Sequence, residues 1–137
     1  MEREFVSYTE ALALKELGFD EKCYGYFTRD EEFFYFDVDD LSSAYTKNMD
    51  NIVVNSVNGL ECTAPLYQQA FRWFREKYGL KGEVDTADMI WSKWSFKTEL
   101  KGSTYILYSG LTEKIYFNTY EEAELACLKK LIEIVKK

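Results

Sequence analysis

Three helix signals, at the start, middle and end of this 137-residue chain, restrict its fold more than any other feature. The first predicted helix begins at Ser7, where Ser7 and Glu10 have the spacing of a capping box, and it ends at Gly18. The last begins at Thr119, where Thr119 and Glu122 repeat that spacing, and it runs almost to the end of the chain. In each pair, we expect the two side chains to satisfy one another's free backbone N–H groups.

The middle helix is predicted to begin at Thr63, with Pro65 in its first turn, and to end at Gly79. Its apolar and polar residues separate onto two faces at helical spacing, which predicts one buried and one solvated side. The apolar side holds Leu66, Tyr67, Ala70, Phe71, Trp73, Phe74 and Tyr78, and the polar side holds Gln68, Gln69, Arg72, Arg75 and Glu76.

The segments between the helices have the composition of strands. Cys23 to Phe27 and Glu32 to Val38 predict a hairpin, and the short run Ile52 to Val54 is compatible with one more strand. A three-stranded meander is predicted over 90–99, 104–108 and 114–117. The predicted fold class is therefore α+β, with antiparallel sheets packed against three helices in the order α-ββ-α-βββ-α, in a single domain over residues 1–137.

The two ends of the chain resemble each other. Phe5 to Ala11 and Phe117 to Ala123 match, identically or conservatively, at five of seven positions. One interpretation is that capping boxes recur because helix starts recur, and the other is a duplicated helix-plus-strands unit. The second would give an internal pseudo-repeat.

Three blocks, EALALKELGFDE, APLYQQAFRWFREKYGL and TYEEAELACLKKLIEIVK, resemble blocks in small uncharacterised proteins of gut Bacteroidota and their phages. They cover about a third of the chain, and their order makes them specific as a set. The resemblance implies an origin in a phage or mobile element, and it carries over no functional residues.

Several catalytic chemistries lack their usual residues. The chain has no histidine, which excludes every mechanism that depends on one. Cys62, next to the predicted helix start at Thr63, is interpreted as a small packed residue rather than as a nucleophile. Asp37, Asp39 and Asp40 lack the spacing of a calcium loop, and no phosphate-binding glycine motif occurs. We therefore expect no enzyme, no metal and no cofactor, although chemistry by carboxylates and tyrosines alone stays open.

Charge and hydropathy restrict the surroundings of the chain. A net charge of −7 opposes general nucleic-acid binding. No stretch has the length and apolarity of a secretory signal or a membrane span. The three cysteines lack zinc-site spacing and are expected to be reduced. Together these features predict a cytoplasmic location without membrane binding.

Aromatic residues make up 18% of the chain and are its one positive functional feature. If Phe34, Phe36, Trp94 and Phe96 face the helices, an aromatic set remains on the opposite strand faces, where rings can stack on a ligand. Two arginines of the middle helix are candidates to pair with a phosphate or carboxylate. The predicted ligand-binding set is therefore Tyr24, Tyr26, Tyr35, Trp91, Arg72 and Arg75. The alternative is that these rings fill a two-sided core or a subunit interface.

These observations predict a noncatalytic binding protein. The phage resemblance suggests an accessory or counter-defence factor that sequesters a small nucleotide-like ligand or blocks a host protein. The alternative is a structural or interaction module that acts as a homo-oligomer through its aromatic faces.

Overall fold

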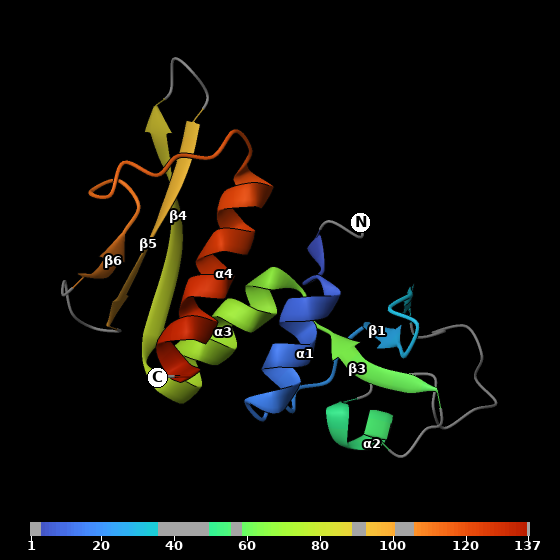
Figure 1. Cartoon of the computed structure of the whole chain (residues 1–137). Coiled ribbons are helices and arrows are strands. Elements are labelled where there is room, and N and C mark those ends of the chain that lie inside the picture. Colours follow the sequence, from blue (N-terminus) through green and yellow to red (C-terminus); the bar gives the residue numbers. More distant parts are fainter. Residues whose placement is uncertain (1–3, 36–49, 56–58, 89–92, 101–105, 137) are drawn as a thin grey trace. The chain divides into compact units, whose positions relative to one another are not determined.

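Two three-stranded antiparallel sheets, each with its own helices, make up the fold (Figure 1). The structure is a computed structural model, and it describes residues 4–35, 50–55, 59–88, 93–100 and 106–136. The chain divides into two compact units, Met1–Leu66 and Tyr67–Lys137, which are described separately below. The α+β class is confirmed, whereas the single domain over 1–137 stays a prediction.

Helix α1 spans Tyr8–Glu16 and ends as predicted. Gly18 has a φ of 95°, the Gly18 N–H donates to the Lys15 carbonyl (3.0 Å), and the Phe19 N–H donates to the Leu14 carbonyl (2.9 Å). These are the two bonds of a Schellman motif. The predicted reciprocal capping box at the start of the helix is wrong, because the Ser7 hydroxyl donates to the Glu10 carboxylate and makes no bond to a backbone N–H.

The sheet of the first unit has the order β2-β1-β3, with β1 at Gly25–Thr28, β2 at Phe33–Tyr35 and β3 at Leu60–Ala64. The predicted hairpin is confirmed as β1 and β2. The predicted helix start at Thr63 is wrong, since Thr63 lies in β3 opposite Tyr26. The chain stays extended there because the Thr63 N–H donates to Asn51 Oδ1 (2.8 Å) and the Pro65 carbonyl accepts from the Val6 N–H (2.8 Å).

A five-residue helix, α2 at Asn51–Asn55, occupies the place of the strand considered for 52–54. Its Val54 is fully buried and packs against Tyr26 and Leu60. Its buried Asn51 holds three segments together, because its Nδ2 donates to the Phe19 carbonyl (2.9 Å) while its Oδ1 accepts from β3. A polar side chain that bonds distant backbone groups therefore decides the conformation of this segment.

The second unit contains α3 (Tyr67–Tyr78), β4 (Leu80–Asp88), β5 (Lys93–Leu100), β6 (Ile106–Ser109) and α4 (Tyr120–Lys136). Its sheet has the order β4-β5-β6, and α4 packs along one face of β4 and β5 (Figure 1). β4 belongs to a segment that the sequence analysis left unassigned. The predicted strand at 114–117 is wrong, because 111–114 form turns and only Phe117 makes an isolated bridge, to Trp94.

Helix α3 buries the side that the sequence predicts. Tyr67, Ala70, Phe71, Trp73 and Phe74 are the buried residues of α3. At the start of α4, Thr119 Oγ1 accepts from the Glu122 N–H (3.1 Å), which confirms one half of the second capping box. The buried residues of α4 are Ala123, Glu124, Cys127, Leu128, Leu131 and Ile132.

The two similar heptapeptides have partly similar surroundings. Phe5 bridges Leu66 just before α1, and Phe117 bridges Trp94 just before α4. The tyrosine three residues after each phenylalanine makes an edge contact with a ring of a strand, Tyr8 with Phe27 and Tyr120 with Trp94. The capping arrangements differ, and the pseudo-repeat stays a prediction.

Candidate functional site

The strand register places the predicted tyrosines on different faces of the first sheet. Tyr26 lies opposite Phe34 and stacks on it, with centroids 5.8 Å apart and ring planes 25° apart. Tyr35 lies opposite Gly25 and packs edge-on against Phe5 (5.6 Å). Because successive residues of a strand point to opposite faces, Tyr26 and Tyr35 do not share a stacking surface.

The structure distributes the rest of the predicted set. Tyr24 and Tyr35 are exposed, at 53% and 47% of their surface, and Tyr26 is half-buried. Arg72 is exposed and Arg75 is half-buried, and both lie on α3 in the second unit. The three tyrosines belong to the first unit. Trp91 lies outside the described residues. Ligand binding by this set stays a prediction.

The expectation about ring orientation holds for one sheet only. Phe96 is 5% exposed on the face that α4 covers, as predicted. Phe34 is 44% exposed, so its predicted packing against a helix is wrong. The reason is register: Phe27 and Phe33 face the α1 side, where Phe27 meets Tyr8 (5.6 Å), and Phe34 therefore points to the other face. Phe36 lies outside the described residues.

A group of exposed apolar side chains begins in β6 and continues in the segment that follows it. Leu107, Leu111, Ile115 and Tyr116 are each between 40% and 51% exposed, and all lie within ten residues of the chain. We call these four residues the apolar turn. Isolated exposed apolar residues are ordinary, but a gathering of large ones often marks a contact surface.

The backbone of the apolar turn is fastened to β5. The Gly110 N–H donates to the Phe96 carbonyl (2.8 Å), and the Ile115 N–H donates back to the Gly110 carbonyl (2.8 Å). The Ser95 hydroxyl donates to the Ile115 carbonyl (2.9 Å). Only glycine fits at position 110, because a Cβ there would lie 2.3 Å from Ser95 Oγ. The exposed side chains are therefore presented by an ordered backbone.

Mixed charges occupy the sheet face opposite α4. Lys97 lies 3.4 Å from Glu83 and Lys81 lies 3.5 Å from Glu99, and longer contacts of 3.8 Å and 4.0 Å join the two pairs. The pKa of Lys97 is raised by the negative charges of Glu99 and Glu83. Two lysines and two glutamates balance one another, so this face carries charge of both signs beside the apolar turn.

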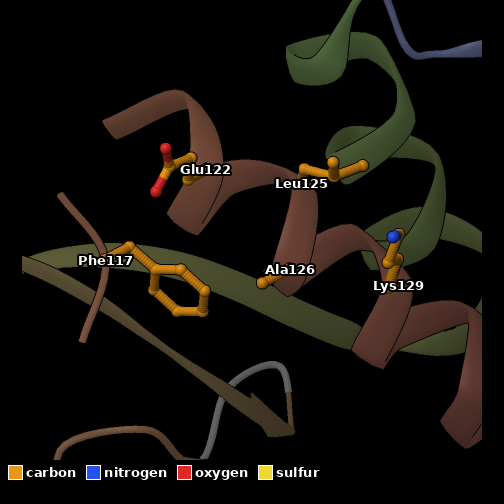
Figure 2. Close-up of a pocket in the computed structure, with 5 residues that line it drawn as sticks. All are labelled: Phe117, Glu122, Leu125, Ala126 and Lys129. Carbon is orange, nitrogen blue, oxygen red and sulfur yellow. The ribbon is translucent and has the colours of Figure 1, made fainter. Parts of the chain in front are cut away.

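A shallow pocket of about 280 Å³ lies on α4, lined by Phe117, Glu122, Leu125, Ala126 and Lys129. Figure 2 shows the Phe117 ring pointing toward Ala126, with Glu122 and Lys129 before and after Ala126 on the same helix. Its volume is slightly below that of pockets for drug-sized ligands, about 300–1,000 Å³. The lining offers apolar contact and one charge of each sign.

The described cysteines are unsuited to nucleophilic chemistry. None of Cys23, Cys62 and Cys127 forms a disulfide, and all three are buried. Burial raises the pKa of Cys62 and that of Cys127 to about 12, so neither forms a thiolate near neutral pH. Cys62 lies within strand β3.

Other classes of site are not found in the part of the chain that the structure describes. No group of three or more Cys, Asp or Glu residues there could hold a metal ion, and Asp37, Asp39 and Asp40 lie outside it. No described helix combines the length and apolarity needed to cross a membrane. Comparisons with protein-family models, with curated proteins and with solved structures each found no match.

The sequence does not predict the apolar turn. The predicted strand over 114–117 would alternate Ile115 and Phe117 with two outward residues. One local feature of the sequence points to the turn, because Gly110 directly follows β6. In the structure, Lys114 has a left-handed φ of 57°, which interrupts an extended strand. Which apolar residues stay exposed depends on the hydrogen bonds to β5, which are not readable from the turn sequence itself.

Proposed function

We propose that this chain is a noncatalytic binding protein whose partner is another protein, bound at the apolar turn. One observation carries the proposal: four large apolar side chains, Leu107 on β6 and three in the segment after it, are exposed, and the backbone of that segment is hydrogen-bonded to β5. Binding releases water from those side chains, and the ordered backbone reduces the conformational entropy lost on association.

The surroundings of the turn support a protein partner. Protein interfaces combine an apolar centre with a polar rim, and the ion pairs of Lys81, Glu83, Lys97 and Glu99 provide polar surface on the same sheet. A nucleotide-like ligand has less support, because Tyr26 and Tyr35 occupy opposite faces of their sheet. The resemblance to phage-borne proteins favours a host protein as the partner, and with it a counter-defence role in the host cytoplasm.

Photo-crosslinking in Bacteroidota cells tests this proposal. A photoreactive phenylalanine analogue replaces Leu111 in the apolar turn, and in a control chain it replaces Glu76, which is exposed on α3. We expect one discrete adduct from position 111 and none from position 76. Adding Ile115→Glu to the first chain should abolish the adduct while the circular dichroism spectrum stays unchanged.

Two crosslinking results would contradict the proposal. The same adducts from both positions, or none from position 111, would contradict a protein partner at the apolar turn. A thermal-shift series with nucleotides addresses the small-ligand alternative, for which any specific rise in melting temperature would count. We expect no such rise.

A further inference from the structure

Strand β4 forms one edge of the second unit's sheet. Among the described residues its strand neighbour is β5, in the order β4-β5-β6. It is nine residues long, and its pairing runs unbroken from Leu80 to Thr86, with a register shift only between Thr86 and Asp88. A regular strand at a sheet edge presents backbone N–H and C=O groups that another strand can pair with.

Burial values indicate that solvent reaches this edge. On the face that α4 covers, Phe96 and Thr98 of the central strand are 5% and 0% exposed. Their partners in β4, Val84 and Gly82, point to the same face and remain half-exposed. Leu80, on the same face, is 5% exposed, so solvent reaches this face of β4 at Gly82 and Val84.

We propose that the β4 strands of two copies of this chain pair antiparallel across a two-fold axis at Gly82, forming one six-stranded sheet. In this register Lys81 of each copy faces Glu83 of the other, and Leu80 faces Val84. Each of the two Lys81–Glu83 pairs across the axis joins a positive and a negative side chain, which favours strand pairing. The axis makes the contact self-complementary, as closed dimers require.

Neighbouring registers are less favourable. An axis at Glu83 places the two Glu83 carboxylates directly opposite each other, and an axis at Val84 places Glu83 opposite Asp85 in both halves. Like charges directly opposite destabilise a strand pair. The order Lys81-Gly82-Glu83 therefore selects the register centred on glycine, and it specifies a second copy as the occupant.

This inference does not depend on the proposed function. The apolar turn consists of Leu107 in β6 and residues after it, and β6 is at the opposite edge of the sheet from β4. Failure of the dimer would leave the crosslinking result at Leu111 untouched, and failure of the crosslinking would leave the dimer untouched.

Complementary charge variants of the full chain test the pairing. Glu83→Lys makes both facing positions positive, and Lys81→Glu makes both negative. Light scattering after size exclusion should give twice the mass of one chain for the unaltered protein and one chain mass for each variant alone. An equimolar mixture of the two variants should recover the dimer, because every facing pair is again of opposite sign.

Lys97→Glu is the matched control. It disturbs the same ion pairs within one copy, but Lys97 lies on the inner strand and faces no residue of the second copy. We expect this variant to remain dimeric, with circular dichroism confirming that all variants are folded. A dimeric Glu83→Lys chain, or a mixture that stays monomeric, would overturn the register.

Amide hydrogen exchange of the unaltered chain provides a measurement that needs no variant. Pairing protects the outward N–H groups of β4, so their exchange should slow as protein concentration rises. Exchange that is fast and independent of concentration, together with one chain mass throughout the micromolar range, would overturn the proposal.

Discussion

Gly82 illustrates how one atom controls the packing of α4 on its sheet. A Cβ at this position would lie 2.8 Å from Cys127 Sγ and 2.9 Å from Leu131 Cδ1. We expect Gly82→Ala to lower the free energy of unfolding by about 1–3 kcal/mol, as overpacking does. Urea unfolding followed by circular dichroism measures this change.

The rescue of that variant is specific. Cys127→Ala removes the Sγ atom, so it should offset part of the loss from Gly82→Ala. Gly79→Ala is the control, because Gly79 has a φ of 66° and a Cβ there would meet nothing within 4 Å. The loss of stability in Gly79→Ala comes from backbone strain, so adding Cys127→Ala should not reduce that loss. Equal rescue of both glycine variants would contradict the packing explanation.

The buried thiols predict how stability changes at high pH. Burial is the largest cause of the rise in the pKa of Cys62 and Cys127, from 9.0 to about 12. The unfolded chain therefore loses these protons at a lower pH than the folded chain. Their contribution is fully present below pH 9 and is lost as the pH rises from 9 toward 12.

Urea unfolding between pH 8 and pH 11 measures this loss of stability. The pKa values of Tyr8, Tyr108 and Tyr120 are also raised, mainly by burial, so the tyrosines lower stability in the same direction. The thiol part is isolated by Cys127→Ala, whose stability should fall less steeply with pH than that of the unaltered chain. Identical slopes for the two proteins would refute the assignment.

Between elements, Asn51 is the main polar connection of the first unit. It bonds the Phe19 carbonyl beyond α1 and the Thr63 N–H in β3, and it is buried. Asn51→Ala removes both of these buried hydrogen bonds, and we expect it to lower the free energy of unfolding by about 1–3 kcal/mol. Asn55→Ala, at an exposed position of the same helix, should change the free energy of unfolding much less. Similar losses in the two variants would contradict this role.

Helix signals in the sequence were reliable where the deciding contacts are local. Gly18 ends α1 and Thr119 caps α4 through bonds within five residues. The Thr63-to-Pro65 pattern failed because the partner of Thr63 is Asn51, twelve residues away. Ile52 to Val54 favoured a strand by β-branching, but tertiary packing of Val54 places the segment in a helix.

The positions of the strands and the faces of the site residues depend on strand pairing, which cannot be read from the sequence. β4 alternates Lys81, Glu83 and Asp85 with less polar residues, and its charged side forms ion pairs with Lys97 and Glu99 of β5. The high aromatic content of 18% is evident from the sequence alone. Whether Tyr26 and Tyr35 share a face, however, depends on the β1–β2 register, which a single sequence does not specify.

At the scale of the whole chain, each unit contains core residues of its own. In the first unit, Leu14, Phe19 and Cys62 are almost completely buried among α1, the chain that follows it and β3. In the second, Phe74 and Leu128 are fully buried on α3 and α4. A three-stranded sheet that packs against helices is among the smallest arrangements that form a stable domain.

We therefore expect residues 67–137 to fold when they are produced alone. This fragment keeps α3, the β4-β5-β6 sheet and α4, together with the ion pairs and turn bonds described above. Its circular dichroism should show helix and strand, and its thermal unfolding should be cooperative. Leu128→Ala within the fragment should lower the melting temperature, because it creates a cavity in that core. A fragment without cooperative unfolding would instead support one domain over residues 1–137, since the second core would then require the first unit.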